Sequence, residues 1–170
     1  MTELQRILLI EDSAYDVELI LTALSENALA NEVVVVRDGE EALDYLYRRG
    51  VFRLRLEGNP IVILLDLKLP KIDGIEVLSA LKADPMLRLI PVVVLTSSQE
   101  EPDLFHCYEL GTNAYVVKPI DFHEFVEVIK QVGLFLPREE IGLVWSELQG
   151  ADTCLRREIK LVKLNPEYIR

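Results

Sequence analysis

The chain has 170 residues, half of them apolar, and a formal net charge of −11 at pH 7. This length and apolar content suffice for one ordinary domain with an extension, and they exclude an intrinsically disordered chain. The acidic balance and the lack of a visible basic face argue against nucleic-acid binding.

Short β-rich runs alternate with helical periodicity from residue 4 to about residue 132. Five βα units in succession predict a parallel sheet with right-handed crossovers and helices on both faces. The predicted strands are 7–10, 32–36, 61–65, 92–95 and 114–117, and the predicted helices are 14–27, 39–49, 74–84, 101–110 and 121–132.

Residues at the helix ends support these bounds. Ser13 with Asp16 resembles a capping box at the start of the first helix. The basic segment 48–58 is expected to be a surface loop before the third strand. Aspartates mark three further helix starts and a glycine suits the end of the fourth helix: Asp38, Asp73, Asp121 and Gly111.

Two of the predicted strands end in acidic residues. Asp66 closes the apolar run 61–65, and Glu11-Asp12 follows the run 7–10. The carboxyl ends of parallel strands form the rim where open α/β sheets place ligands. If these strands are neighbours, three carboxylates share one pocket, where each pair about 5 Å apart repels by roughly 3 kcal/mol at an effective dielectric near 20.

Such a cluster requires raised pKa values or a bound cation. Carboxylates without nearby histidine or thiol ligands favour a hard ion such as Mg²⁺. Thr96 at the end of the fourth strand and Lys118 before Pro119 at the end of the fifth would lie on the same rim. Each alone is more often a cap or a solvated residue, but together with the acids they indicate one shared site.

With these segments the chain resembles, over about residues 4–135, the receiver domain of two-component response regulators. The resemblance implies a flavodoxin-like (βα)5 fold with strand order 2-1-3-4-5. It also implies a protein that catalyses only its own phosphoryl transfer and dephosphorylation. The matching segments are ILLIED at 7–12, LLDLKLPKIDG at 64–74, VLTS at 94–97 and YVVKP at 115–119.

Segments 36–46, 81–85 and 107–111 resemble a narrower group, the single-domain regulators paired with bacterial and cyanobacterial phytochrome kinases. That resemblance implies a sensor histidine kinase of the phytochrome type as the phosphoryl donor, with Asp66 as the acceptor. Asp12, Asp66 and the backbone carbonyl of Lys68 would bind Mg²⁺ or Mn²⁺, and Glu11 would act through water.

The resemblance also implies a switch. Lys118 and the Thr96 hydroxyl would bond phosphoryl oxygens, and Tyr115 would swing into the space that Thr96 vacates. Lys68 stands where the phytochrome group often has Asn, and we expect it to alter the lifetime of the phosphorylated state. The output surface would comprise the fourth helix, fifth strand and fifth helix around Phe105, Tyr108, Glu109 and Phe125.

Residues 136–170 form a C-terminal extension. Its apolar side chains at Ile141, Val144, Trp145 and Leu148 have helical spacing, which predicts an amphipathic helix over about 138–149. The extension either packs back on the receiver or serves as a docking or dimerisation element around Trp145. We expect a homodimer.

Alternative functions remain open at this point. A receiver scaffold could act as a phosphorylation-independent interaction module, whereas a small-substrate phosphohydrolase lacks a second general acid. No apolar run approaches a membrane span, so no membrane role is expected. With only Cys107 and Cys154, reduced thiols in the cytoplasm are expected.

Overall fold

The computed structural model describes residues 6–27, 32–97 and 101–131. The C-terminal extension, with the predicted helix 138–149, Trp145 and Cys154, lies outside the described residues. Within the described part of the chain, no helix combines the length and the apolar character needed to cross a membrane.

The core of the fold is a five-stranded parallel sheet with the order β2-β1-β3-β4-β5, as predicted. Every residue of β1, β3 and β4 is buried, because helices cover both faces of the sheet. Two strands run one residue further than predicted, so that Asp66 and Thr96 are the last residues of β3 and β4. The strands are β1 (Arg6–Ile10), β2 (Glu32–Val36), β3 (Val62–Asp66), β4 (Val92–Thr96) and β5 (Ala114–Val117).

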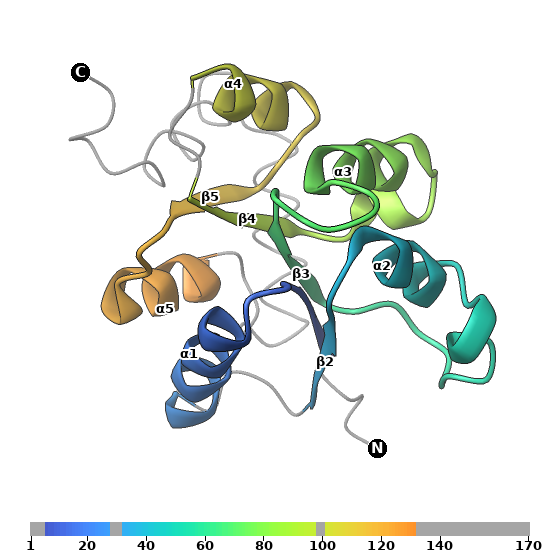
Figure 1. The fold of residues 1–170 in the computed structure, drawn as a ribbon, viewed down its shortest axis with the longest axis horizontal. Helices are drawn as coiled ribbons and strands as arrows, with labels where there is room; N and C mark the ends of the chain where they lie inside the picture. The colour runs from blue at the N-terminus through green and yellow to red at the C-terminus, as the bar shows by residue number, and fades with distance from the viewer. Residues whose placement is uncertain (1–5, 28–31, 98–100, 132–170) are drawn as a thin grey trace, which may run out of the picture.

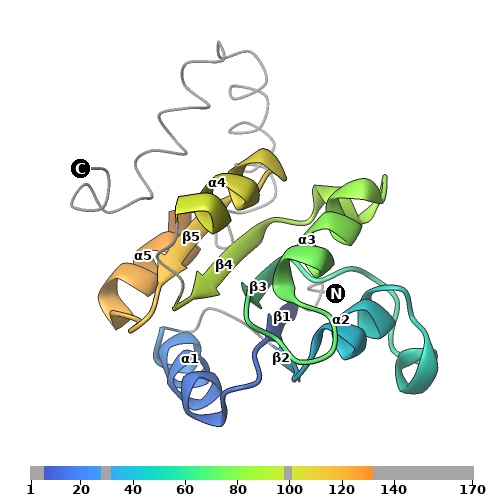
Figure 2. The same ribbon diagram turned by 45° about the horizontal axis from the view of Figure 1, so that its top comes forward.

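The helices form two layers, one on each face of the sheet (Figures 1 and 2). One layer contains α1 and α5, and its core includes Ile20 and Leu24 from α1. The other contains α2, α3 and α4, and its core includes Leu78 and Cys107. The helices are α1 (Ala14–Glu26), α2 (Gly39–Leu46), α3 (Gly74–Ala83), α4 (Glu101–Glu109) and α5 (Phe122–Gln131), with short 3-10 turns η1 (Gly50–Phe52) and η2 (Leu87–Leu89).

Side-chain caps fix the starts of the helices where the sequence predicted them. The Asp38 carboxylate accepts from the backbone amide of Glu41 at 2.8 Å. Asp73 and Glu76 form a reciprocal capping box at the start of α3. Each bond satisfies an amide that the first turn of a helix leaves without a backbone partner.

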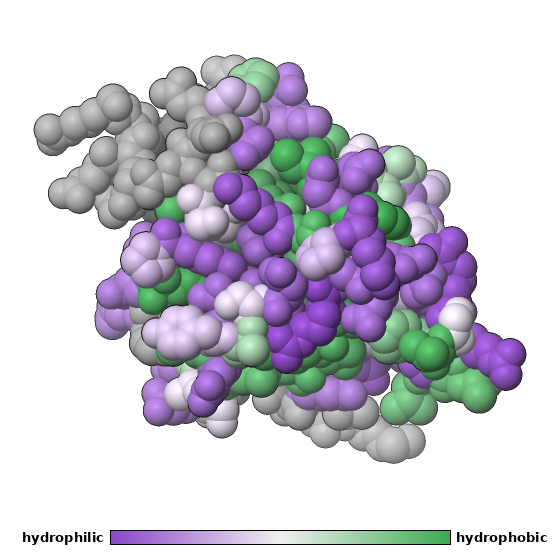
Figure 3. Space-filling model, viewed as in Figure 1, coloured by the Kyte–Doolittle hydropathy of each residue, from purple (hydrophilic) through white to green (hydrophobic). Residues whose placement is uncertain are grey.

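The connection from α2 to β3 is more ordered than the predicted surface loop. Helix α2 ends three residues earlier than predicted, and Arg48 shortly beyond it has a positive φ of 56°. The Arg55 guanidinium lies over the Tyr45 ring, 4.4 Å from its centroid, and donates to the Tyr45 carbonyl at 2.8 Å. Exposed hydrophobic side chains lie in η1 and just after it: Val51, Leu54 and Leu56. Figure 3 shows hydrophobic surface on the face of the molecule that it draws.

The prediction that Phe125 belongs to the output surface is wrong. Phe125 is fully buried, in the core cluster that contains Ile20 of α1 and Val116 of β5. Helix α5 turns its apolar face toward the sheet and α1, and the large ring fills the space between them. Phe105 on α4 is instead 65% exposed.

We therefore expect Phe125→Ala to lower the free energy of unfolding by about 3–5 kcal/mol, because the lost ring leaves a cavity. Phe105→Ala, a matched control at an exposed position, is expected to change it by less than about 0.5 kcal/mol. Urea unfolding followed by circular dichroism measures both. Equal losses in the two variants would contradict this assignment of core and surface.

Candidate functional site

Three carboxylates meet at the carboxyl edge of the sheet, as predicted. Ile10 of β1 pairs with Leu65 of β3, so Glu11 and Asp66 directly follow a paired position on neighbouring strands. One carboxylate oxygen each from Glu11, Asp12 and Asp66 lies within 4.8 Å of the others. The register of two adjacent parallel strands thus produces the cluster.

Burial makes this cluster costly when all its members are ionised. Glu11 is fully buried and Asp66 is 5% exposed, whereas Asp12 is exposed. Burial raises the pKa of Glu11 and of Asp66, and the hydrogen bond or charge of Lys118 only partly offsets this. A bound cation would favour the ionised carboxylates.

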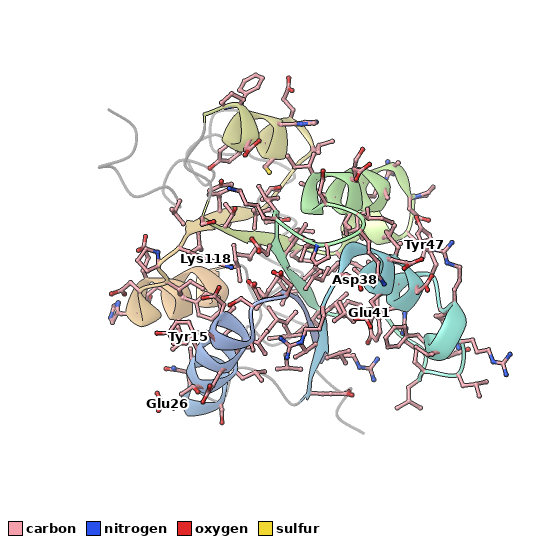
Figure 4. The ribbon with its side chains drawn as sticks, viewed as in Figure 1. Tyr15, Glu26, Asp38, Glu41, Tyr47 and Lys118 are labelled. Carbon is pink, nitrogen blue, oxygen red and sulfur yellow. The ribbon has the colours of Figure 1, made fainter. Side chains whose placement is uncertain are left out.

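Lys118, labelled in Figure 4, brings a positive charge to the same carboxylate cluster. Its ammonium lies 2.6 Å from Glu11 Oε2 and 3.5 Å from Asp66 Oδ2. A third carboxylate, Asp16 Oδ2, lies 3.0 Å away. Burial alone would lower the pKa of Lys118, but the hydrogen bonds to Glu11 and Asp16 outweigh it and raise that pKa, so the ammonium stays charged.

Asp16 is the rim residue that the sequence analysis missed. We assigned it only to the cap of α1, where its backbone amide indeed donates to Ser13 Oγ at 3.3 Å. Its side chain does not complete the capping box and binds Lys118 instead. The sequence does contain a signal, because Asp16 lies in the first turn of the helix that starts directly after the acidic pair Glu11-Asp12.

Thr96 and Tyr115 lie where the fold places the ends of β4 and β5. Thr96 is fully buried, and its carbonyl accepts from the Lys118 amide at 2.8 Å. Tyr115 is 3% exposed and packs in the core cluster that contains Cys107. Its side chain is therefore inside the protein in this structure. On α4, Glu109 is exposed and Tyr108 half-buried.

The loop after Asp66 is fixed from two sides. The Gly74 amide donates to the Leu67 carbonyl at 2.8 Å, and a Cβ on Gly74 would collide with the backbone of Asp66 and Leu67. Lys71, at a positive φ of 65°, binds Asp38 and Glu40 of the α2 start at 2.9 and 3.0 Å. The close approach at Gly74 therefore requires a glycine beside the backbone of Asp66, and the Lys71 ion pairs fix the other side of the loop.

The donor set suits a hard divalent cation. Glu11, Asp12 and Asp66 offer only oxygen ligands, and this group contains no imidazole or thiol, which is the chemistry that Mg²⁺ and Mn²⁺ prefer. The Lys68 side chain is exposed, and backbone hydrogen bonds from Leu67 and Lys68 lower the pKa of Asp66 against the effect of burial. The site is therefore an acidic pocket with one ammonium at a strand edge.

Comparison with known proteins agrees with this geometry. The family model of the response regulator receiver domain matches residues 7–130. The response regulator Rcp1 of Synechocystis sp. is 39% identical over 129 residues, covering 76% of this chain and 86% of that protein.

Three solved structures extend the likeness. The bacteriophytochrome response regulator RtBRR is 60% identical, with a TM-score of 0.72, and the match covers 79% of this chain and 81% of that one. The phosphorylated cyanobacterial phytochrome response regulator RcpA is 44% identical, with a TM-score of 0.67, and the match covers 77% of this chain and 92% of that one. A crystal structure of Rcp1 contains Mn²⁺; it is 38% identical with a TM-score of 0.67, and the match covers 77% and 93% of the two chains.

Proposed function

The chain belongs to the response regulator receiver family, and from that premise we propose that Asp66 accepts a phosphoryl group from a sensor histidine kinase. The observation that carries this proposal is the pocket itself. Asp66 ends a buried strand beside two further carboxylates and 3.5 Å from the Lys118 ammonium. A buried carboxylate with a cation at hand is suited to nucleophilic attack on phosphorus.

In the transfer, a carboxylate oxygen of Asp66 forms a bond to phosphorus while the bond from phosphorus to the imidazole nitrogen of the donor breaks. The imidazole leaves with the bonding electron pair. Lys118 and the Thr96 hydroxyl donate hydrogen bonds to the phosphoryl oxygens and so stabilise the charge of the product. The protein is in this proposal the substrate of its own phosphorylation and dephosphorylation, and it turns over no separate small molecule.

The same acids would hold Mg²⁺, with Asp12, Asp66 and the Lys68 carbonyl as direct ligands and Glu11 acting through water. When bound, the ion would neutralise charge on the transferring group and its acceptor. The all-oxygen donor set supports this assignment, as does the Mn²⁺ found in Rcp1.

We further infer that the donor is a phytochrome-type photoreceptor kinase. The support is the identity of 60% to RtBRR and of 44% to RcpA, which are named as phytochrome response regulators. The signal would pass through Thr96 and Tyr115 to the surface of α4, where Phe105, Tyr108 and Glu109 lie. The cytoplasmic location stays a prediction from the low cysteine content.

We expect the full chain to bind beryllofluoride, a mimic of the phosphoryl group, only when Mg²⁺ is present. Asp66→Asn should abolish this binding, because it removes the anionic oxygen that coordinates beryllium. Isothermal titration calorimetry measures the affinity. The control Asp44→Asn alters an α2 carboxylate that pairs with Arg49 at 3.2 Å, and it should bind like the parent. A parent chain that does not respond to Mg²⁺ and beryllofluoride would favour the phosphorylation-independent interaction module.

Lys68→Asn should shorten the lifetime of the phosphorylated chain, because the exposed cation two residues after Asp66 would otherwise contact the phosphoryl group or hinder an attacking water. The chain is loaded with a small-molecule phosphodonor, and the loss of phosphate is followed over time. Lys68→Arg keeps a long cation and should behave like the parent. An unchanged rate in Lys68→Asn would remove the idea.

We also propose that the extension mediates homodimerisation. A chain that ends at Pro137 lacks the predicted helix and Trp145, and it should be monomeric under conditions in which the full chain is dimeric. Light scattering at matched concentrations gives both masses. The same oligomeric state for the two chains would dismiss this role and leave the extension as a segment that packs on the receiver.

A further inference from the structure

Asp16 has no part in the phosphoryl transfer described above, yet it binds the lysine on which that transfer depends. The Lys118 ammonium lies 3.0 Å from Asp16 Oδ2 and 3.5 Å from Asp66 Oδ2. Building on the proposed function, we propose that Asp16 is a positioning residue that competes with the phosphoryl group for Lys118 and so opposes the phosphorylated state.

The bonding of Lys118 defines the competition. An ammonium has three N–H donors. Glu11 and Asp16 accept at 2.6 and 3.0 Å, so the two short bonds go to residues other than the acceptor. Lys118 follows directly after β5 (Figure 4) and reaches the first turn of α1 through Asp16. The third donor faces Asp66 at 3.5 Å, and an ammonium that moves toward a phosphoryl oxygen on Asp66 would lengthen its bond to Asp16 on α1.

The charge of the pocket points in the same direction. Three carboxylates lie next to the ammonium, those of Glu11, Asp16 and Asp66, and Asp12 clusters with Glu11 and Asp66. That cluster is the one suited to a divalent cation, so the Asp16 charge is in excess of that requirement. Phosphorylation adds negative charge, since a phosphoryl group carries about −1.5 to −2 at neutral pH. The negative charge of Asp16 therefore repels the incoming phosphoryl group. Asp16 also binds the Lys118 ammonium, which would otherwise neutralise the charge of that group.

Burial makes the contact stronger than an ordinary surface ion pair. The side chains of Lys118 and Asp16 are 12% and 22% exposed. Water and salt screen such a pair only in part, whereas fully exposed pairs contribute little. The Asp16 carboxylate can therefore influence which partner Lys118 binds.

A purely structural role for Asp16 is the competing explanation. An acidic residue in the first turn of a helix interacts favourably with the helix dipole, and Asp16 occupies that position in α1. That role predicts lower thermal stability on substitution. It predicts no gain in affinity for a phosphoryl mimic, because the helix dipole does not discriminate between the free and the phosphorylated pocket.

The test is Asp16→Asn in the full chain, with two affinities measured by calorimetry. Mg²⁺ is titrated alone, and beryllofluoride is then titrated at saturating Mg²⁺. Loss of the carboxylate should weaken Mg²⁺ binding, because the pocket becomes less negative. It should tighten beryllofluoride binding by about threefold to tenfold, as expected for loss of a partly buried charge contact. The backbone amide that donates to Ser13 is retained, so the cap of α1 persists.

Two further variants control for charge and geometry. Glu18→Gln removes one negative charge from the exposed side of the same helix and should change neither affinity. Asp16→Glu keeps the charge and should restore values near those of the parent.

Opposite changes in the two affinities support the proposal, because a loosened helix would weaken both. Unchanged or weaker beryllofluoride binding in Asp16→Asn would overturn it while the parent still binds. A parent chain that fails to bind beryllofluoride with Mg²⁺ would overturn this proposal together with the proposed function, so the two failures are distinguishable.

Discussion

The bonds of one buried ammonium organise the site of this protein. Lys118 lies 2.6, 3.0 and 3.5 Å from carboxylates of Glu11, Asp16 and Asp66, and it joins the ends of β1, β3 and β5 to the first turn of α1. Without that charge, the buried acids would repel one another in a region of low dielectric. The same ammonium would donate a hydrogen bond to a phosphoryl group on Asp66. One side chain would therefore both stabilise the buried acids and take part in the proposed phosphorylation.

The sheet explains why these groups meet. In a parallel sheet, the carboxyl ends of adjacent strands lie on one edge. The register pairs Asp66 with Leu95 and Thr96 with Val117, so Asp66 and Thr96 end neighbouring strands. Gly74 then lets α3 approach the Asp66 backbone more closely than a Cβ would permit. Because the strands are packed on both faces, this edge of the sheet holds the Asp66 carboxylate in a fixed position.

Helices α5 and α4, which belong to different layers, differ in where they place their aromatic side chains. Helix α5 commits Phe125 to the core with α1, whereas α4 leaves Phe105 exposed. A surface that responds to Asp66, as proposed, would therefore lie on the α4 side, where Cys107 of α4 and Tyr115 of β5 belong to one buried cluster. In the proposed switch, this packing would transmit a small movement at a strand end to α4, since close-packed cores deform little.

The sequence by itself determined the order of strands and helices, the helix caps, and the rim positions of Glu11, Asp12, Asp66, Thr96 and Lys118. These follow from local periodicity and from the rule that parallel strands end at one edge. Only the tertiary structure decided that Phe125 is buried and that Asp16 binds Lys118. The burial of Phe125 depends on which face of α5 packs against α1 and the sheet. The bond of Asp16 depends on which carboxylates the long Lys118 side chain can reach. Both are contacts between segments that are distant in the chain, so no single segment determines them.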